Sequence, residues 1–171
     1  MIKHLTLMLF AVAVAVAPIN AQEPAQSEKT MRDLLVAGWL DINERIVKMA
    51  EDFPESKYEF KATKEVRSFA DVLRHVAFWN DWATKTVRGE KPDGRPNELP
   101  KAQFATKAQI VAALKKSVEA GISELKAGAA NVPVTAARTW ISFLSHSSEH
   151  YGQLVVYYRL NGLVPPASRT P

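Results

Sequence analysis

Two histidines four residues apart carry the clearest chemical signal in this chain. His146 and His150 lie in a stretch whose apolar spacing predicts a helix. Four residues make about one helical turn, roughly 6 Å of rise, so both imidazoles leave the same face of that helix. In this geometry two neutral ring nitrogens can bind one metal ion.

Histidine is scarce elsewhere in the chain. Of its four histidines, His4 lies near the amino terminus and His75 is the remaining one. Three neutral imidazoles would leave the charge of a divalent ion uncompensated and a coordination position open to water, as in catalytic zinc sites. The alternative is that three core histidines donate hydrogen bonds to backbone carbonyls. The pattern favours ligation, so we predict a metal site at His75, His146 and His150.

Residues 146–150 read His-Ser-Ser-Glu-His, which also fits the H-x-x-E-H pattern of inverzincin proteases with Glu149 as general base. Those enzymes use a further glutamate ligand downstream, and residues 151–171 contain neither Asp nor Glu. The protease interpretation is therefore disfavoured. Glu149 is expected to orient a neighbouring group or to face solvent, and the sequence assigns no catalytic residue.

Four amphipathic helices must position these histidines. Apolar periodicity predicts them at about 27–52, 68–88, 106–127 and 135–160, and no alternating strand pattern is present. Three of them begin with capping-box residues three positions apart, at Thr30 and Asp33, at Ser68 and Asp71, and at Thr106 and Gln109. The predicted fold is all-α, a four-helix bundle with the metal site between helices two and four.

The connection over 89–105 is long and irregular, with three prolines and two glycines. It is long enough to overlie a pocket, and it leaves an up-down-up-down topology and a crossover topology both open. Near the site, Trp79 and Trp82 lie on the face of His75 and form either bundle core or a pocket wall. Gly152 is expected at a close helix contact, and Gln153 is expected to bond a ligand residue or a buried backbone group.

The amino terminus predicts export. A short basic start is followed by an apolar run from Leu5 to Ala17 and by the small residue Ala21, which indicates a signal peptide at 1–21. The run is shorter than the roughly 20 residues that span a bilayer, so an uncleaved anchor is the weaker alternative and no stable membrane span is expected after removal of the signal. We predict a periplasmic or secreted protein.

Residues 22–171 have the usual length of one domain. The chain has no cysteine, which excludes disulfides, a thiolate nucleophile and Cys-bearing zinc sites. Its formal charge of +4 is spread along the chain, and no basic stripe interleaved with aromatics is present, so nucleic-acid binding is not indicated.

The stretch Leu73-Arg74-His75-Val76-Ala77-Phe78-Trp79, followed by His146-x-x-x-His150-Tyr151-Gly152-Gln153-Leu154, resembles the DinB-like superfamily of metal-binding four-helix bundles. The resemblance covers essentially all of 22–171. It implies a divalent ion, commonly zinc or nickel, at His75, His146 and His150, and it also implies homodimers. Some relatives transfer low-molecular-weight thiols or isomerise maleylpyruvate with a thiol, and most have no assigned reaction. A resemblance to such a family predicts the fold more reliably than the function.

Two function classes follow. The first is a metal-dependent enzyme, a hydrolase or a thiol S-transferase acting on an unknown small molecule, with the ion as Lewis acid. The second is a non-catalytic metal or small-ligand binding bundle of the cell envelope. The export signal weakens the thiol-transferase version, because the thiols used by such relatives are chiefly cytosolic.

Overall fold

The computed structural model describes residues 29–170, so the predicted signal peptide at 1–21 lies outside the described residues. Four α-helices account for most of this range: α1 (Met31–Asp52), α2 (Phe69–Val87), α3 (Lys107–Ala127) and α4 (Val134–Leu160). Two short 3₁₀ helices are also present: η1 (Glu55–Lys57) lies between α1 and α2, and η2 (Pro166–Ser168) follows α4. The predicted all-α four-helix architecture is confirmed, with no strand among the residues described.

All three predicted capping boxes are present. Thr30, Ser68 and Thr106 each accept a hydrogen bond from the backbone N–H three residues on, and the side chain of that later residue accepts one from the cap backbone. Each box satisfies two backbone donors that a helix start otherwise leaves unpaired. The starts of α1, α2 and α3 are therefore determined locally.

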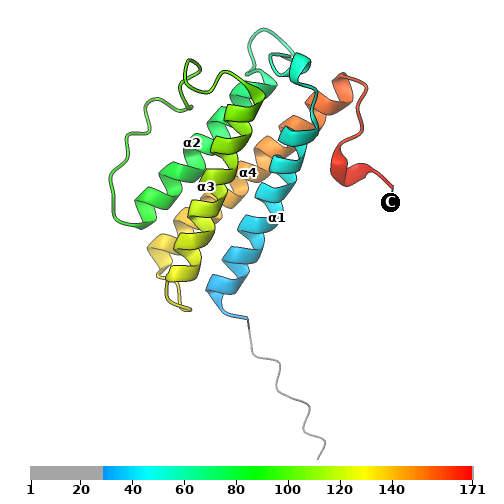
Figure 1. The fold of residues 1–171 in the computed structure, drawn as a ribbon. Helices are drawn as coiled ribbons and strands as arrows, with labels where there is room; N and C mark the ends of the chain where they lie inside the picture. Colours follow the sequence, from blue (N-terminus) through cyan, green and yellow to red (C-terminus); the bar gives the residue numbers. More distant parts are fainter. Residues whose placement is uncertain (1–28, 171) are drawn as a thin grey trace, which may run out of the picture.

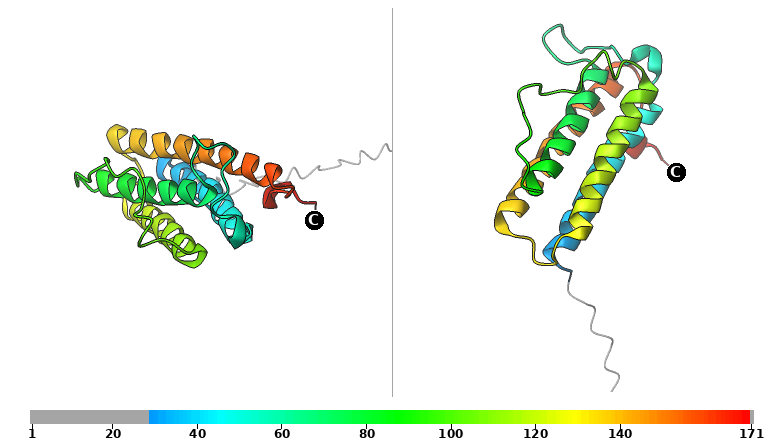
Figure 2. Two further views of the ribbon diagram at one scale, coloured as in Figure 1. Left: turned by 90° about the horizontal axis from the view of Figure 1, so that it is seen from above. Right: turned by 60° about the vertical axis from the view of Figure 1, so that its left-hand side comes forward.

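The helices are joined by a crossover. Figure 1 shows α1 and α4 running in one direction and α2 and α3 in the other, so α2 and α3 are parallel. The 88–106 connection returns along the length of the bundle to join them, and it runs outside the helices in Figure 1 and in the right-hand view of Figure 2. Of the two topologies left open by the sequence, the crossover is the one observed. α1 and α2 each pack against both α3 and α4.

Apolar side chains fill the interior in two clusters. One surrounds Phe53, Phe69 and Tyr158 at the end where α1 stops and α2 starts, and the other surrounds Trp39 and Trp140 toward the opposite end. Between residues 29 and 170, no helix has both the length and the apolar character needed to cross a membrane.

Candidate metal centre

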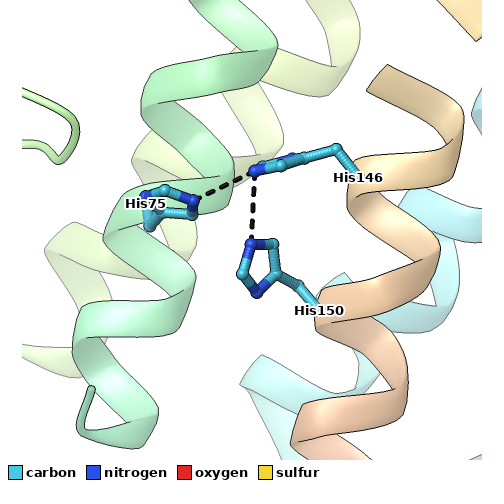
Figure 3. A group of neighbouring side chains, drawn as sticks. All are labelled: His75, His146 and His150. Carbon is cyan, nitrogen blue, oxygen red and sulfur yellow. Dashed lines mark hydrogen bonds between the residues drawn. The ribbon is translucent and has the colours of Figure 1, made fainter. Parts of the chain in front are cut away.

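The three predicted histidines lie together. Figure 3 shows the ring of His75 reaching from α2 toward the rings of His146 and His150 on α4. The Nε2 atom of His146 lies 3.0 Å from Nε2 of His75 and 3.2 Å from Nε2 of His150. One ring nitrogen from each residue lies within 4.8 Å of the other two. The three histidines could therefore hold one metal ion.

The nitrogen spacing suits a small ion. Zinc binds imidazole nitrogen at 2.0–2.1 Å with tetrahedral geometry, which places two ligand nitrogens about 3.3 Å apart. The two Nε2 separations, 3.0 and 3.2 Å, are close to that value. Among the described residues, this group contains three histidines and no carboxylate.

His75 is oriented by the 88–106 connection. Its Nδ1 lies 2.6 Å from the backbone carbonyl oxygen of Asn97. A carbonyl can only accept, so Nδ1 carries the proton and Nε2 of the neutral ring presents a lone pair to the other histidines. Asn97 has a φ of 63°, in the left-handed region, and its side-chain oxygen accepts a hydrogen bond of 2.9 Å from Nε1 of Trp79. The connection is thus fastened to α2 at the site.

His150 is oriented by a relay of hydrogen bonds along α4. The hydroxyl of Tyr157 donates to the carbonyl oxygen of Arg67 at 2.6 Å, so it can accept from the Gln153 amide nitrogen at 3.1 Å. That leaves the Gln153 oxygen to accept from Nδ1 of His150 at 3.0 Å. Because the Arg67 carbonyl can only accept, the direction of every bond in the relay is determined. Nε2 of His150 therefore also presents a lone pair.

The lone pairs of His75 and His150 both point toward Nε2 of His146, and no hydrogen bond orients the His146 ring from its other side. Its Nδ1 is buried without a hydrogen-bond partner. A proton on Nε2 could satisfy only one of the two neighbouring nitrogens, and a proton on Nδ1 leaves three lone pairs converging. A cation in the middle accepts all three lone pairs at once, which is the electrostatic reason that this arrangement fits a metal ion.

Burial keeps the imidazoles neutral. Desolvation is the main cause that lowers the pKa of His75 to about 4 and that of His146 to about 3, and the charge of nearby Arg67 acts in the same direction. Desolvation also lowers the pKa of His150, opposed by its hydrogen bond to Gln153. All three rings are therefore in the form that coordinates metal at neutral pH.

Other predictions around the site fared differently. Glu149 is exposed, as one of its two predicted roles requires, and Gln153 bonds His150 as expected. The prediction for Gly152 is wrong: a Cβ at this position would meet nothing within 4 Å, because it faces away from the neighbouring helices. The close contact lies instead at Gly121, where a Cβ would come within 2.7 Å of the Trp39 ring.

Two residues of the site were missed from the sequence. Tyr157 had no predicted role at the site, although its spacing of seven residues from His150, with Gln153 between, places all three along one helix face and could have indicated the relay. Asn97 left no periodic signal, because it acts through a backbone carbonyl in an irregular segment.

Comparison with known families agrees with this geometry. The family model of the DinB superfamily matches residues 41–154, a span that contains all three histidines. The chain belongs to the DinB superfamily. The resemblance seen around His75 and from His146 to Leu154 is thereby confirmed. No curated protein matches the chain with significant similarity.

In this DinB superfamily protein, the three histidine ligands determine what a bound metal ion could do. Three neutral imidazoles supply no negative charge, so a bound divalent ion would keep its full charge for polarising a further ligand. The protein's own contribution is to aim Nε2 of His75 and His150 by tying down the opposite ring nitrogens. Such partners of metal-binding histidines orient the ring and raise its basicity.

Proposed function

We propose that this protein is a metal-dependent enzyme of hydrolase or thiol S-transferase type that acts on a small molecule at a zinc or nickel ion held by His75, His146 and His150. The observation that carries the proposal is the convergence of the Nε2 atoms of His75 and His150 on that of His146. A bound ion would supply a Lewis acid that activates water or a thiol. The three residues would hold it and leave a position open.

Two experiments test whether the protein binds a metal ion and whether that ion has an open coordination position. Protein freed of metal with a chelator is titrated with Zn²⁺ and Ni²⁺ by calorimetry, with one ion per chain as the expected stoichiometry. The Co²⁺-loaded protein is then titrated with glutathione and its absorption spectrum is followed. A new sulfur-to-cobalt charge-transfer band supports an open position, whereas binding of less than one ion per chain would contradict the proposal.

The second candidate is a non-catalytic metal or small-ligand binding bundle. It is favoured by the exposure of Glu149, the one acidic residue within the His146 to His150 motif, because an exposed carboxylate is poorly placed as a general base. In this case the cobalt spectrum of the loaded protein would not respond to glutathione.

We further propose that the protein is exported to the periplasm or secreted after cleavage following Ala21 and that it forms a homodimer. The apolar run from Leu5 to Ala17 supports export. An exposed face of α4 supports association: Ile141 and Val156 are 53% and 50% exposed, and Gly152 between them is open. Intact-mass measurement of envelope protein and sedimentation of Ile141→Glu beside the wild type test the two points.

A further inference from the structure

An open groove lies beside the candidate metal centre, and none of the three histidines lines it. Its volume is about 530 Å³, within the usual range for small-molecule sites. Trp79 and Trp82 on α2 line one side, and Arg138, Ser142 and Phe143 are among the residues of α4 that line the other.

The groove adjoins the histidine cluster through two of its aromatic walls. The ring of Phe143 lies 5.7 Å from that of His146, centroid to centroid, and the ring of Trp79 lies 6.3 Å from it. Trp79 and Phe143 stack with centroids 5.7 Å apart and planes 23° from parallel. Since Phe143 precedes His146 by three residues, groove and metal centre share one face of α4.

The indoles present apolar surface to the groove, because their polar ends are already occupied. Nε1 of Trp79 donates to the Asn97 side chain at 2.9 Å, and Nε1 of Trp82 donates to the Pro92 carbonyl at 3.1 Å. A Cβ at Gly94 would lie 3.2 Å from Trp79 and 3.4 Å from Trp82, so the 88–106 connection packs closely behind both rings. Rings fixed in this way favour a planar apolar ligand.

Arg138 gives the groove a charge. Its side chain is exposed and has no hydrogen bond or ion pair with any other residue of the described range, whereas Arg67, Arg74 and Arg88 each pair with a carboxylate. No acidic residue lines the groove. A guanidinium with free donors suits a carboxylate, which it can bind through two parallel hydrogen bonds.

The spacing limits the length of the ligand. Arg138 precedes His146 by eight residues, which is about 12 Å along the helix. We propose that the groove binds an aromatic carboxylate about 10–12 Å long, with its acid group on Arg138, its planar body against Trp82 and Phe143, and its other end at the Trp79–Phe143 stack that adjoins His146. Only the reactivity of that far end rests on the proposed function; binding of the acid and the rings does not.

The test compares two probes of the same shape, biphenyl-4-carboxylate and the neutral biphenyl-4-carboxamide. Their binding to the metal-loaded protein is measured by tryptophan fluorescence and calorimetry. Wild-type protein should bind the carboxylate at least about tenfold more tightly than the carboxamide. Arg138→Gln should abolish this preference, and Phe143→Leu should weaken both probes while circular dichroism shows an unchanged fold.

Arg159→Gln is the matched control, because Arg159 is also exposed on α4, lacks an ion pair with the other described residues and does not line the groove. It should retain the full preference for the carboxylate. Equal binding of the two probes by the wild type, absence of binding, or equal losses in Arg138→Gln and Arg159→Gln would each overturn the proposal.

Zinc titration of the same samples separates this inference from the proposed function. Normal zinc binding without probe binding would defeat the groove proposal alone. Preferential binding of the carboxylate by a protein that takes up no zinc would leave the groove proposal standing and defeat the metal-dependent function.

Discussion

The interface of α1 with α3 and that of α2 with α4 have opposite characters. Between α1 and α3, Gly121 lets the Trp39 ring approach closely, and Nε1 of Trp39 donates to the Val118 carbonyl at 3.1 Å. Between α2 and α4, the three histidine rings face one another beside the stacked rings of Trp79 and Phe143, and hydrogen bonds orient two of the imidazoles. The difference teaches that a packing variant at Trp39 and a ligand variant at a histidine should perturb stability and metal binding separately.

The largest expected effect is on stability. Trp39→Ala should lower the free energy of unfolding by about 3–5 kcal/mol, because the ring is fully buried and would leave a cavity. Under conditions where the variant stays folded, zinc affinity should be unchanged. Urea unfolding beside zinc titration measures both. Trp82→Ala, which removes a half-buried indole, should cost less than half as much.

Removing one histidine should have the converse effect. His150→Ala should weaken zinc binding by at least about 100-fold, because one of three protein ligands is lost. Helix content should stay nearly constant, since alanine is a good helix former. The neighbouring Ser148→Ala, on the exposed side of α4, is the control. Wild-type affinity in His150→Ala would remove this residue from the site.

Loss of the hydrogen-bond relay should weaken zinc binding less than loss of His150, the residue that the relay orients. Gln153→Leu removes the acceptor for Nδ1 of His150 and should lower zinc affinity about 10- to 100-fold. Tyr157→Phe leaves the amide in place but deletes the hydroxyl that sets its direction, so a loss of about tenfold or less is expected. Tyr151→Phe, at a tyrosine outside the relay, should bind zinc normally.

The smallest effect concerns pH. Burial lowers the pKa of folded His75 to about 4, whereas the unfolded imidazole titrates near 6.5, so the unfolded state binds more protons in that range. The stabilisation that neutral His75 gives the metal-free protein is therefore fully present above pH 6.5 and is lost as pH falls toward 4. Between pH 6.5 and 5.5, one buried imidazole should lower the free energy of unfolding by about 1 kcal/mol.

His75→Gln should flatten the stability profile by that amount. Urea unfolding of wild type and variant at several pH values, with chelator present, measures the change. Identical profiles would mean that His75 titrates alike in the folded and unfolded states.

Local patterns explain which features the sequence could predict. Capping boxes depend on residues three apart, so the starts at Thr30, Ser68 and Thr106 follow from sequence alone. The meeting of His75 with the α4 pair also follows once four helices must bury their apolar faces together. Helix direction did not follow, because a long irregular connection is compatible with either topology.

Contacts made by the backbone or by one particular helix face were harder to predict. The role of Asn97 depends on a left-handed φ and on where its carbonyl points, and neither has a compositional signature. A helical glycine such as Gly152 can face a neighbouring helix or solvent, and its position beside the histidine motif does not decide between the two. Gly121, three residues from Val118 and four from Leu125 on the apolar face of α3, had the more informative spacing.

The crossover has a consequence for how the protein could diversify. Parallel α2 and α3 need a connection that spans about 28 Å, the length of the 19-residue α2, and roughly nine extended residues would suffice. Residues 88–106 provide about twice that length. Part of the surplus is fixed, because Leu99 and Phe104 pack on the core, and the carbonyl at 97 and the packing at 94 reach the candidate metal centre and the groove. Exchange of the exposed residues between these contacts would therefore change the surroundings of the site while the helices stay in place.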